Sequence, residues 1–373
     1  MVGDYTYIED TDNDTFWNAT EYVLYMYDGG NTSSDDISGG CCEDGLSGFS
    51  ASKNLTVQGS PLADSMNLNI DRDDELTGNL ILNMGAGNDT LGSAKLKNGD
   101  SVDMGAGDDS VGIMATGSNG TPTIANLSLT LLDGGAGSDT LAYQEGGANT
   151  TELTLTTGNA TNFENITGTS GAETIKGDAN ANTLIGKGAA DTLYGYAGND
   201  TLVGSTGEDT LDGGTGTDTL TGGSAADTFV IRSGDGSTTL ADANVITDFA
   251  DGTDVIGLDN GLAFDDLTIA QGTGDDASHT LVSITSSSEY LLVIQSTTSS
   301  DVTAVDFAST STDNQTFTGD SGNDTDIGGA GDDTFNGGAG SDTLYGHGGD
   351  DTFNVTSKSG AYTDTGDGGA GTD

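Results

Sequence analysis

The stretch GSTGEDTLDGGTGTDTLT, residues 204–221, contains the same nonapeptide twice. Each copy opens with glycine and carries aspartate at its sixth position (Asp209, Asp218) and leucine at its eighth (Leu211, Leu220). Glycine permits the positive φ angles of a tight turn, and alternation along a short strand sends the eighth side chain to one face. Each nonapeptide therefore predicts a turn and a short strand. Two of them predict one flattened coil with both leucines inside.

The same nine-residue frame recurs in two tandem arrays and in isolated copies. Seven copies follow one another at 168–230 and four at 319–354, and single copies begin at Met84, Met104 and Gly134. Such coils stack by parallel strand pairing, about 4.8 Å apart. The pattern predicts an all-β protein, a parallel β-roll or β-solenoid of GGxGxDxUx nonapeptides with a non-repeat β-rich insert.

The sixth-position aspartates create an electrostatic problem that a cation would solve. Residues eighteen apart lie on the same edge of successive coils, about 5 Å apart, where two carboxylates repel by about 3 kcal/mol at an effective dielectric constant of about 20. One apolar side chain per nonapeptide is a thin core to oppose this repulsion. Calcium accepts about six to eight oxygens from carboxylates and backbone carbonyls, and glycine turns expose carbonyls. We therefore expect several Ca²⁺ ions to be cofactors of the fold.

The candidate metal ligands are the sixth-position aspartates of the arrays and of the isolated copies. They are Asp89, Asp109, Asp139, Asp191, Asp200, Asp209, Asp218, Asp227, Asp324, Asp333, Asp342 and Asp351. An eighteen-residue coil places neighbouring copies on opposite edges. The expected same-edge groups are Asp191, Asp209 and Asp227; Asp200 and Asp218; Asp324 and Asp342; and Asp333 and Asp351.

These nonapeptides resemble the GGxGxDxUx repeats of the RTX (repeats-in-toxin, haemolysin-type calcium-binding) family, which form parallel β-rolls. The resemblance covers 168–230 and 319–354 directly. The stretches NFENITGTSGAETIKGDANANTLIGKG and NVITDFADGTDVIGL are also similar to segments that lead into and close such rolls. The resemblance implies export by a Gram-negative bacterium, usually through a type I apparatus, and calcium-dependent folding outside the cell or at its surface.

Three residues depart from the repeat pattern. The sixth position is Glu173 and Asn182 in the first two copies of the first array, so we expect weak or absent metal binding there. The eighth position is Asp326 in GDSGNDTDI, which would place a carboxylate inside the coil. We expect that coil to be distorted.

Changes in the repeat pattern divide the chain into five segments. They are an aromatic-rich N-terminal cap at 1–58, irregular coils at 59–167, a regular roll at 168–230, a β-rich insert at 231–312 and a second array at 313–373 that ends within a repeat. An aromatic docking surface is the alternative reading of 1–58. In the other irregular segments LTGNLILN, LSLTLLD, HTLVSI and EYLLVIQ read as strands.

Composition restricts the partners. The chain has 373 residues with 61 glycines, 60 acidic and 8 basic residues, and a formal net charge of −52. Nucleic acid is excluded because phosphate binding needs a basic patch, and anionic membrane surfaces are disfavoured. No run of about 18 apolar residues predicts a membrane span, and no Sec-type signal opens the sequence. The adjacent Cys41 and Cys42 cannot form a disulfide framework.

Other motifs are weaker than the repeats. DTDNDTFWNATE at 10–21 has EF-hand spacing, but Thr15 replaces the glycine of the sharp turn, so a degenerate calcium turn is the better interpretation. GDSG at 319–322 is the start of a nonapeptide, and His347 occupies a variable turn position that we expect to be exposed. The sequence contains no H-E-x-x-H and no G-x-S-x-G motif. These observations favour a protein that is not an enzyme.

Three functions are compatible with this pattern. The first is a calcium-loaded structural or adhesive component of a bacterial surface, matrix or filament. The second is the export and folding module of a larger type I-secreted enzyme or toxin. The third is binding of a carbohydrate or a protein by the insert at 231–312. Because the sequence stops at Asp373, within a repeat, we also expect head-to-tail self-association through calcium, unless the sequence is a fragment.

Overall fold

The computed structural model describes residues 5–10, 21–27, 35–36, 54–59, 61, 63–66, 79–96, 98–114, 129–144, 152–156, 159–354 and 363–373. The chain divides into two compact units, Met1–Asp178 with Asn182–Gly188, and Ala179–Ala181 with Ala189–Asp373. Most of the EF-hand-like stretch, including Thr15, and both cysteines lie outside the described residues.

The described residues are almost entirely strands and turns, as the repeats predict. Their helical elements are single 3-10 turns of three residues, such as Leu240–Asp242 and Phe264–Asp266. Among them no helix has the length and apolarity needed to cross a membrane.

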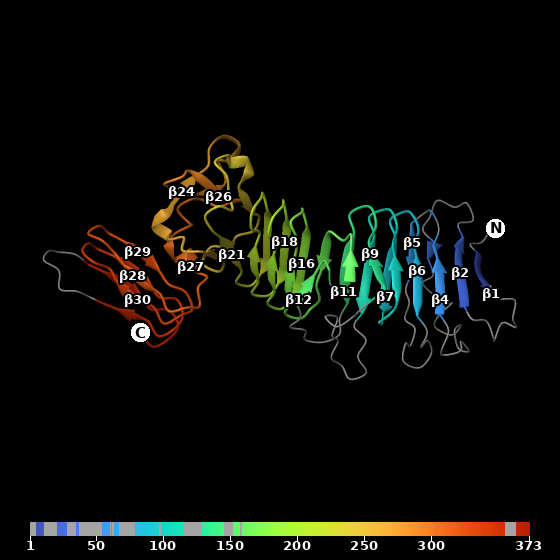
Figure 1. The fold of residues 1–373 in the computed structure, drawn as a ribbon. Coiled ribbons are helices and arrows are strands. Elements are labelled where there is room, and N and C mark those ends of the chain that lie inside the picture. Colours follow the sequence, from blue (N-terminus) through green and yellow to red (C-terminus); the bar gives the residue numbers. More distant parts are fainter. Residues whose placement is uncertain are drawn as a thin grey trace. The chain divides into compact units, whose positions relative to one another are not determined.

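Most strands of the first unit lie in two sheets of mostly parallel strands (Figure 1). One sheet contains β1 (Tyr5–Asp10), β2 (Glu21–Tyr27), β4 (Asn54–Gln58), β6 (Leu80–Asn83), β8 (Ser101–Asp103), β10 (Leu131–Asp133) and β13 (Ala160–Thr161). The other contains β3 (Asp35–Asp36), β5 (Asp64–Met66), β7 (Thr90–Lys95), β9 (Ser110–Met114), β11 (Thr140–Gln144), β14 (Asn165–Thr167) and β16 (Thr183–Gly188). A further pair joins β12 (Glu152–Thr154) to β15 (Thr174–Lys176).

The coils of the first unit have unequal lengths but a constant inner layer. Val102 pairs with Leu132 on one sheet, and Val111 pairs with Leu141 on the other. All four side chains are fully buried. The strands predicted from LTGNLILN and LSLTLLD are confirmed as β6 and β10. Insertions therefore change the length of a coil without changing the apolar pairs.

The second unit begins with the regular repeats. One sheet contains β17 (Thr192–Tyr194), β19 (Thr210–Asp212), β21 (Thr228–Ile231), β23 (Val255–Leu258) and β27 (Phe307–Ser309). The other contains β18 (Thr201–Thr206), β20 (Thr219–Ser224), β22 (Asn244–Ile246), β26 (Glu289–Ile294), β25 (Thr280–Ile284) and β24 (Leu267–Gln271). Leu193 pairs with Leu211 and Leu202 with Leu220, so the eighteen-residue coil is confirmed.

The segment after the regular repeats continues both of their sheets. β22 and β23 pair in parallel with β20 and β21, and β26 and β27 follow them. β24, β25 and β26 form an antiparallel meander, shown in gold in Figure 1. The strands predicted from HTLVSI and EYLLVIQ are confirmed as β25 and β26.

The second array forms two short parallel sheets. One contains β28 (Thr316–Thr318), β30 (Thr334–Asn336) and β32 (Thr352–Phe353), and the other contains β29 (Thr325–Ile327), β31 (Thr343–Tyr345) and β33 (Thr365–Asp367). Asp326 pairs in register with Leu344. The distortion expected at Asp326 is therefore wrong for the pairing of its strand.

Candidate metal centre

The sixth-position aspartates of the regular repeats form a ladder along each edge. The backbone N–H of Asp191 donates to Oδ1 of Asp209 (2.8 Å), and that of Asp209 donates to Oδ1 of Asp227 (2.9 Å). On the other edge the N–H of Asp200 donates to Oδ1 of Asp218 (2.8 Å). One carboxylate oxygen therefore joins each coil to its predecessor, and the same-edge groups are those that the spacing of eighteen predicts.

The irregular coils of the first unit carry the same ladder. The N–H groups of Asp64, Asp89 and Asp109 donate to Oδ1 of the next carboxylate, over 25, 20 and 30 residues, at 2.6–2.7 Å. The acceptors are Asp89, Asp109 and Asp139. The turn and the strand after it, rather than the length of the coil, determine which residues meet.

The second array repeats this arrangement on two edges. Asp324 donates to Asp342 (3.2 Å), and Asp333 donates to Asp351 (2.8 Å). The N–H of Asp351 then donates to Oδ1 of Asp373 (3.0 Å). All twelve sequence-predicted aspartates therefore lie in ladders.

Sequence reasoning missed several members of these ladders because they lack the glycine-rich turn. Asp100 accepts the N–H of Leu80, Glu164 that of Asp139, Asn244 that of Asp218, and Asp254 that of Asp227. These four residues and Asp64 each begin a triplet of an acid or amide, any residue and an apolar residue. The triplets are DSM, DSV, ENI, NVI and DVI. A search for this triplet would have found them.

The second oxygen, Oδ2, of many ladder aspartates is buried without a hydrogen-bond donor in the described part of the chain. This holds for Asp89, Asp109, Asp139, Asp209, Asp218, Asp227 and Asp351. An ionised oxygen removed from water without compensation is costly, so proteins normally pair such oxygens or give them to metals. These atoms therefore need a positive partner.

Burial is the main cause of the shifted pKa values at these carboxylates. It raises the pKa of Asp89 and Asp218 to about 7 and that of Asp139 and Asp227 to about 6, and the hydrogen bond from the preceding coil only partly opposes it. The pKa of Asp209 is raised for the same reason. Without a metal, these carboxyls therefore keep their protons to a higher pH than ordinary carboxyls do. A divalent cation would oppose this shift.

The first glycine of each repeat leaves room where oxygens from two coils meet. A Cβ atom at Gly204 would collide with Oδ2 of Asp209 and would lie 2.7 Å from the carbonyl oxygen of Gly222, in the next coil. Gly213 stands in the same way against Oδ2 of Asp218. A glycine is required here because any side chain would fill the space between the carboxylate and the carbonyl.

This donor set fits calcium. In the described parts no three histidine, cysteine, aspartate or glutamate side chains converge as a ready-made cluster, so backbone carbonyls must complete a site. Calcium uses carboxylate and carbonyl oxygens in this way. Oδ2 of the sixth-position aspartate and the glycine carbonyls of the adjoining turns would hold the ion. The ion would supply the positive charge that the buried oxygens lack.

At four sixth positions of the repeats the side chain accepts a hydrogen bond from within its own turn. Glu173 accepts hydrogen bonds from the N–H and the hydroxyl of Thr169, and Oδ1 of Asn182 accepts the N–H of Asp178 (2.8 Å). In the second array Oδ2 of Asp324 accepts the N–H of Asp320 (2.9 Å), and Oδ2 of Asp333 accepts that of Gly329 (3.0 Å). These side chains use their own turn as the donor.

His347 is half-buried, so the expectation of an exposed side chain is wrong. Its Nε2 is buried without a partner among the described residues, and burial lowers its pKa. The side chain lies near Tyr345, with ring centroids 6.5 Å apart.

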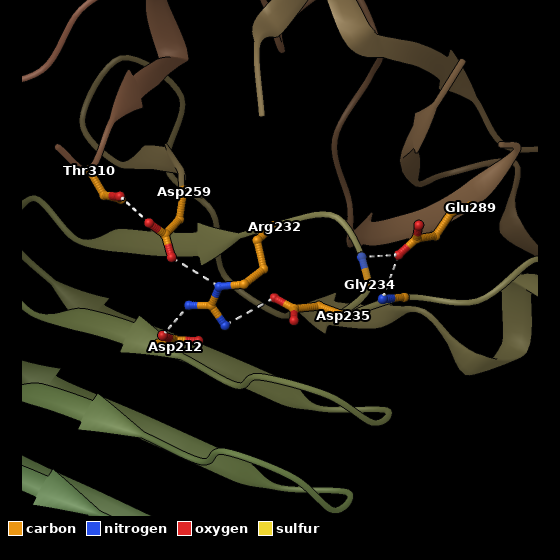
Figure 2. A network of polar contacts seen from close by, with 8 residues as sticks. Asp212, Arg232, Gly234, Asp235, Asp259, Glu289 and Thr310 are labelled. Carbon is orange, nitrogen blue, oxygen red and sulfur yellow. Dashed lines mark hydrogen bonds and ion pairs between the residues drawn. The ribbon is translucent and has the colours of Figure 1, made fainter. Parts of the chain in front are cut away.

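Arg232, which follows the last regular repeat, is surrounded by carboxylates (Figure 2). The Arg232 guanidinium donates to Asp212, lies 3.3 Å from a carboxylate oxygen of Asp235, and donates through Nε to Oδ2 of Asp259 (2.9 Å). Burial acts to lower the pKa of Arg232, but the bond to Asp212 and the nearby carboxylates outweigh it and raise that pKa. An arginine here compensates the carboxylates that a metal would compensate within the roll.

Comparison with known families identifies the repeats. The chain matches the RTX calcium-binding nonapeptide repeat at residues 167–202, 194–229, 203–237, 309–340 and 318–353. No curated protein matches the chain. The chain therefore contains haemolysin-type RTX calcium-binding repeats in multiple copies, arranged in parallel coils.

Proposed function

We propose that this protein is a secreted, non-enzymatic component of a bacterial cell surface, matrix or filament that calcium folds and stiffens. The observation that carries the proposal is the ladder of carboxylates, which continues through coils of 18, 20 and 30 residues. An arrangement repeated along both units suits a load-bearing or spacing element. The source would be a Gram-negative bacterium that exports the chain before calcium binds.

Calcium would act here as a structural cofactor. Before export, scarce calcium leaves the carboxylates to repel one another, which keeps the chain extended and open for transport. Outside the cell, calcium is plentiful enough to occupy sites with dissociation constants of about 10⁻⁴–10⁻³ M. Binding and folding then become one event, because the ligands converge only in the stacked coils.

The alternative is an export and folding module of a larger secreted enzyme or toxin. It is favoured by the matched repeats, which occupy two blocks rather than the whole chain. Fractionation of the source bacterium and immunoblotting with an antibody against 168–230 separate the two. We expect a surface or matrix polypeptide that calcium chelation releases. A larger polypeptide in the culture fluid that carries hydrolytic or membrane-damaging activity would support the alternative.

We also propose calcium-dependent head-to-tail association of the chain. Strand edges and carboxylate turns of a parallel stack can pair with a second copy, with calcium between two chains as between two coils. Light scattering across a calcium titration tests this proposal. A monomer at saturating calcium and high protein concentration would exclude the association.

A further inference from the structure

Asp326 is the only acidic residue at an eighth position in either tandem array. Its partner on the neighbouring strand is Leu344, which is buried in the second array. Oδ2 of Asp326 is buried and has no hydrogen-bond partner among the described residues. A carboxylate therefore occupies a place that the repeat reserves for an apolar side chain.

Asp326 lines a pocket of about 420 Å³ between residues 258–264 and 309–327, within the second unit. Leu262, Phe264, Phe317 and Ile327 contribute apolar walls. The N–H of Thr325 donates to Oδ2 of Asp265 (3.0 Å), which links the two walls. The volume lies in the range of about 300–1,000 Å³ that small-molecule sites occupy.

The buried side-chain polar atoms of this pocket that have no partner among the described residues are hydrogen-bond acceptors. Oε1 of Gln315 is buried without a partner in the described part of the chain, as is Oδ2 of Asp326. Asp259 also lines the pocket, but its two oxygens accept from Arg232 and from the Thr310 hydroxyl (Figure 2). The wall of the pocket therefore contains two buried acceptors without a donor among the described residues, and a ligand that donates hydrogen bonds would satisfy them.

The surrounding charge favours a cation. Asp324, Asp265 and Asp342 are close enough to repel the Asp326 carboxylate. A hydrated metal ion would gain nothing from the apolar walls, whereas an ammonium group on an apolar body would use both. An ammonium group has three donors, and aromatic faces attract cations.

We propose that this pocket binds a small organic ammonium ion. The ammonium group donates to Asp326 and Gln315, and the apolar part of the ligand contacts Phe264 and Phe317. The inference does not depend on the proposed surface function, because it rests on the side chains of Asp326 and Gln315, and neither is one of the sixth-position carboxylates.

The test uses the full chain at saturating calcium, with benzylamine as the probe and benzyl alcohol as its neutral analogue. We expect isothermal titration calorimetry to show at least tenfold tighter binding of benzylamine. Asp326→Leu restores the apolar eighth position of the repeat, so this variant should fold and lose the amine. Asp326→Asn, of nearly the same shape, should weaken binding at least tenfold. Asp275→Asn changes an exposed carboxylate outside the pocket and should leave binding unchanged.

Three results would overturn the proposal. They are equal binding of the amine and the alcohol, unchanged amine binding by Asp326→Leu with its circular dichroism retained, and displacement of the amine by added magnesium or calcium. The last result would make the pocket a metal site.

Discussion

The part of the regular roll at 189–230 and the second array at 313–373 use one nonapeptide to build different interiors. In the regular repeats the inner positions are leucines on both sheets until Phe229. In the second array Phe317, Phe335 and Phe353 stack along one sheet, with centroids 4.8 and 5.0 Å apart. The opposite sheet offers Asp326, Leu344 and Gly366 in the corresponding places.

The carboxylates differ in the same two regions. Oδ2 of Asp209, Asp218 and Asp227 is buried without a donor among the described residues. In the second array Oδ2 of Asp351 is in the same state, but Asp324 and Asp333 accept an N–H from their own turn. The regular repeats thus combine an even core with carboxylates that need a cation. The second array combines an uneven core with carboxylates that are partly satisfied by the backbone. The two regions therefore differ in how much of their stability should come from apolar packing and how much from bound metal.

Removal of calcium should have the largest effect and should separate the two regions. We expect a chelator to abolish most of the β-sheet circular dichroism, because carboxylates about 5 Å apart then repel without compensation. In hydrogen exchange at intermediate calcium, 189–230 should lose protection before 319–353. Magnesium should replace calcium poorly, since it requires stricter octahedral geometry. An unchanged β-sheet signal after chelation would contradict this account.

Truncation of an inner aromatic residue should affect the second array alone. Phe335→Ala removes the middle ring of the stack and should cost about 3–5 kcal/mol, against about 2–5 kcal/mol for Leu211→Ala in the regular repeats. Denaturant unfolding in saturating calcium measures both free energies, and hydrogen exchange locates them. Phe335→Ala should be the more costly change, because the facing sheet offers only one apolar side chain. A smaller cost than that of Leu211→Ala would show that the stack contributes little.

Acid should stabilise the metal-free regular repeats. The pKa of Asp218 is about 7 and that of Asp227 about 6 in the folded chain, above the ordinary value of about 3.9. A raised folded pKa means that the folded state binds more protons, so stability is lost as pH rises from about 4 to about 7. Circular dichroism in chelator should therefore show more β-sheet at pH 5 than at pH 7.5. At saturating calcium the trend should reverse, because protons compete with the ion.

Substitution of one ladder aspartate should have the smallest effect, and that effect should be confined to the edge on which the aspartate lies. Asp209→Asn keeps the hydrogen bond to Asp191 but removes the charge, so it should lower calcium uptake on the edge of Asp191 and Asp227. The edge of Asp200 and Asp218 should remain intact, and Asp218→Asn is the matched control for that edge. Calorimetric titration gives the number of ions, and anomalous scattering gives their positions. Calcium between residues nine apart would contradict the coil.

Much of the fold could be predicted from the repeat, because one nine-residue period is also one structural unit. Nine residues define a turn and a strand, so pairs such as Leu202 and Leu220 could be predicted without coordinates. The members without a glycine turn, Asn244 and Asp254 among them, could not be found by that period. The phenylalanines of the second array could be read from the sequence. That they face a sheet with a single apolar inner side chain, Leu344, depends on which sheet each strand joins. The pocket beside Asp326 depends on packing of the insert, which no local pattern encodes.

The indifference of the ladder to coil length has an evolutionary consequence. Each hydrogen bond of the ladder requires only a turn and the three residues after it, so the rest of the coil is free to lengthen or shorten. A lineage can therefore acquire a new surface peptide by a single in-frame insertion without disturbing the neighbouring ion sites. The same freedom makes the longer coils suitable places to graft a foreign epitope or an affinity tag.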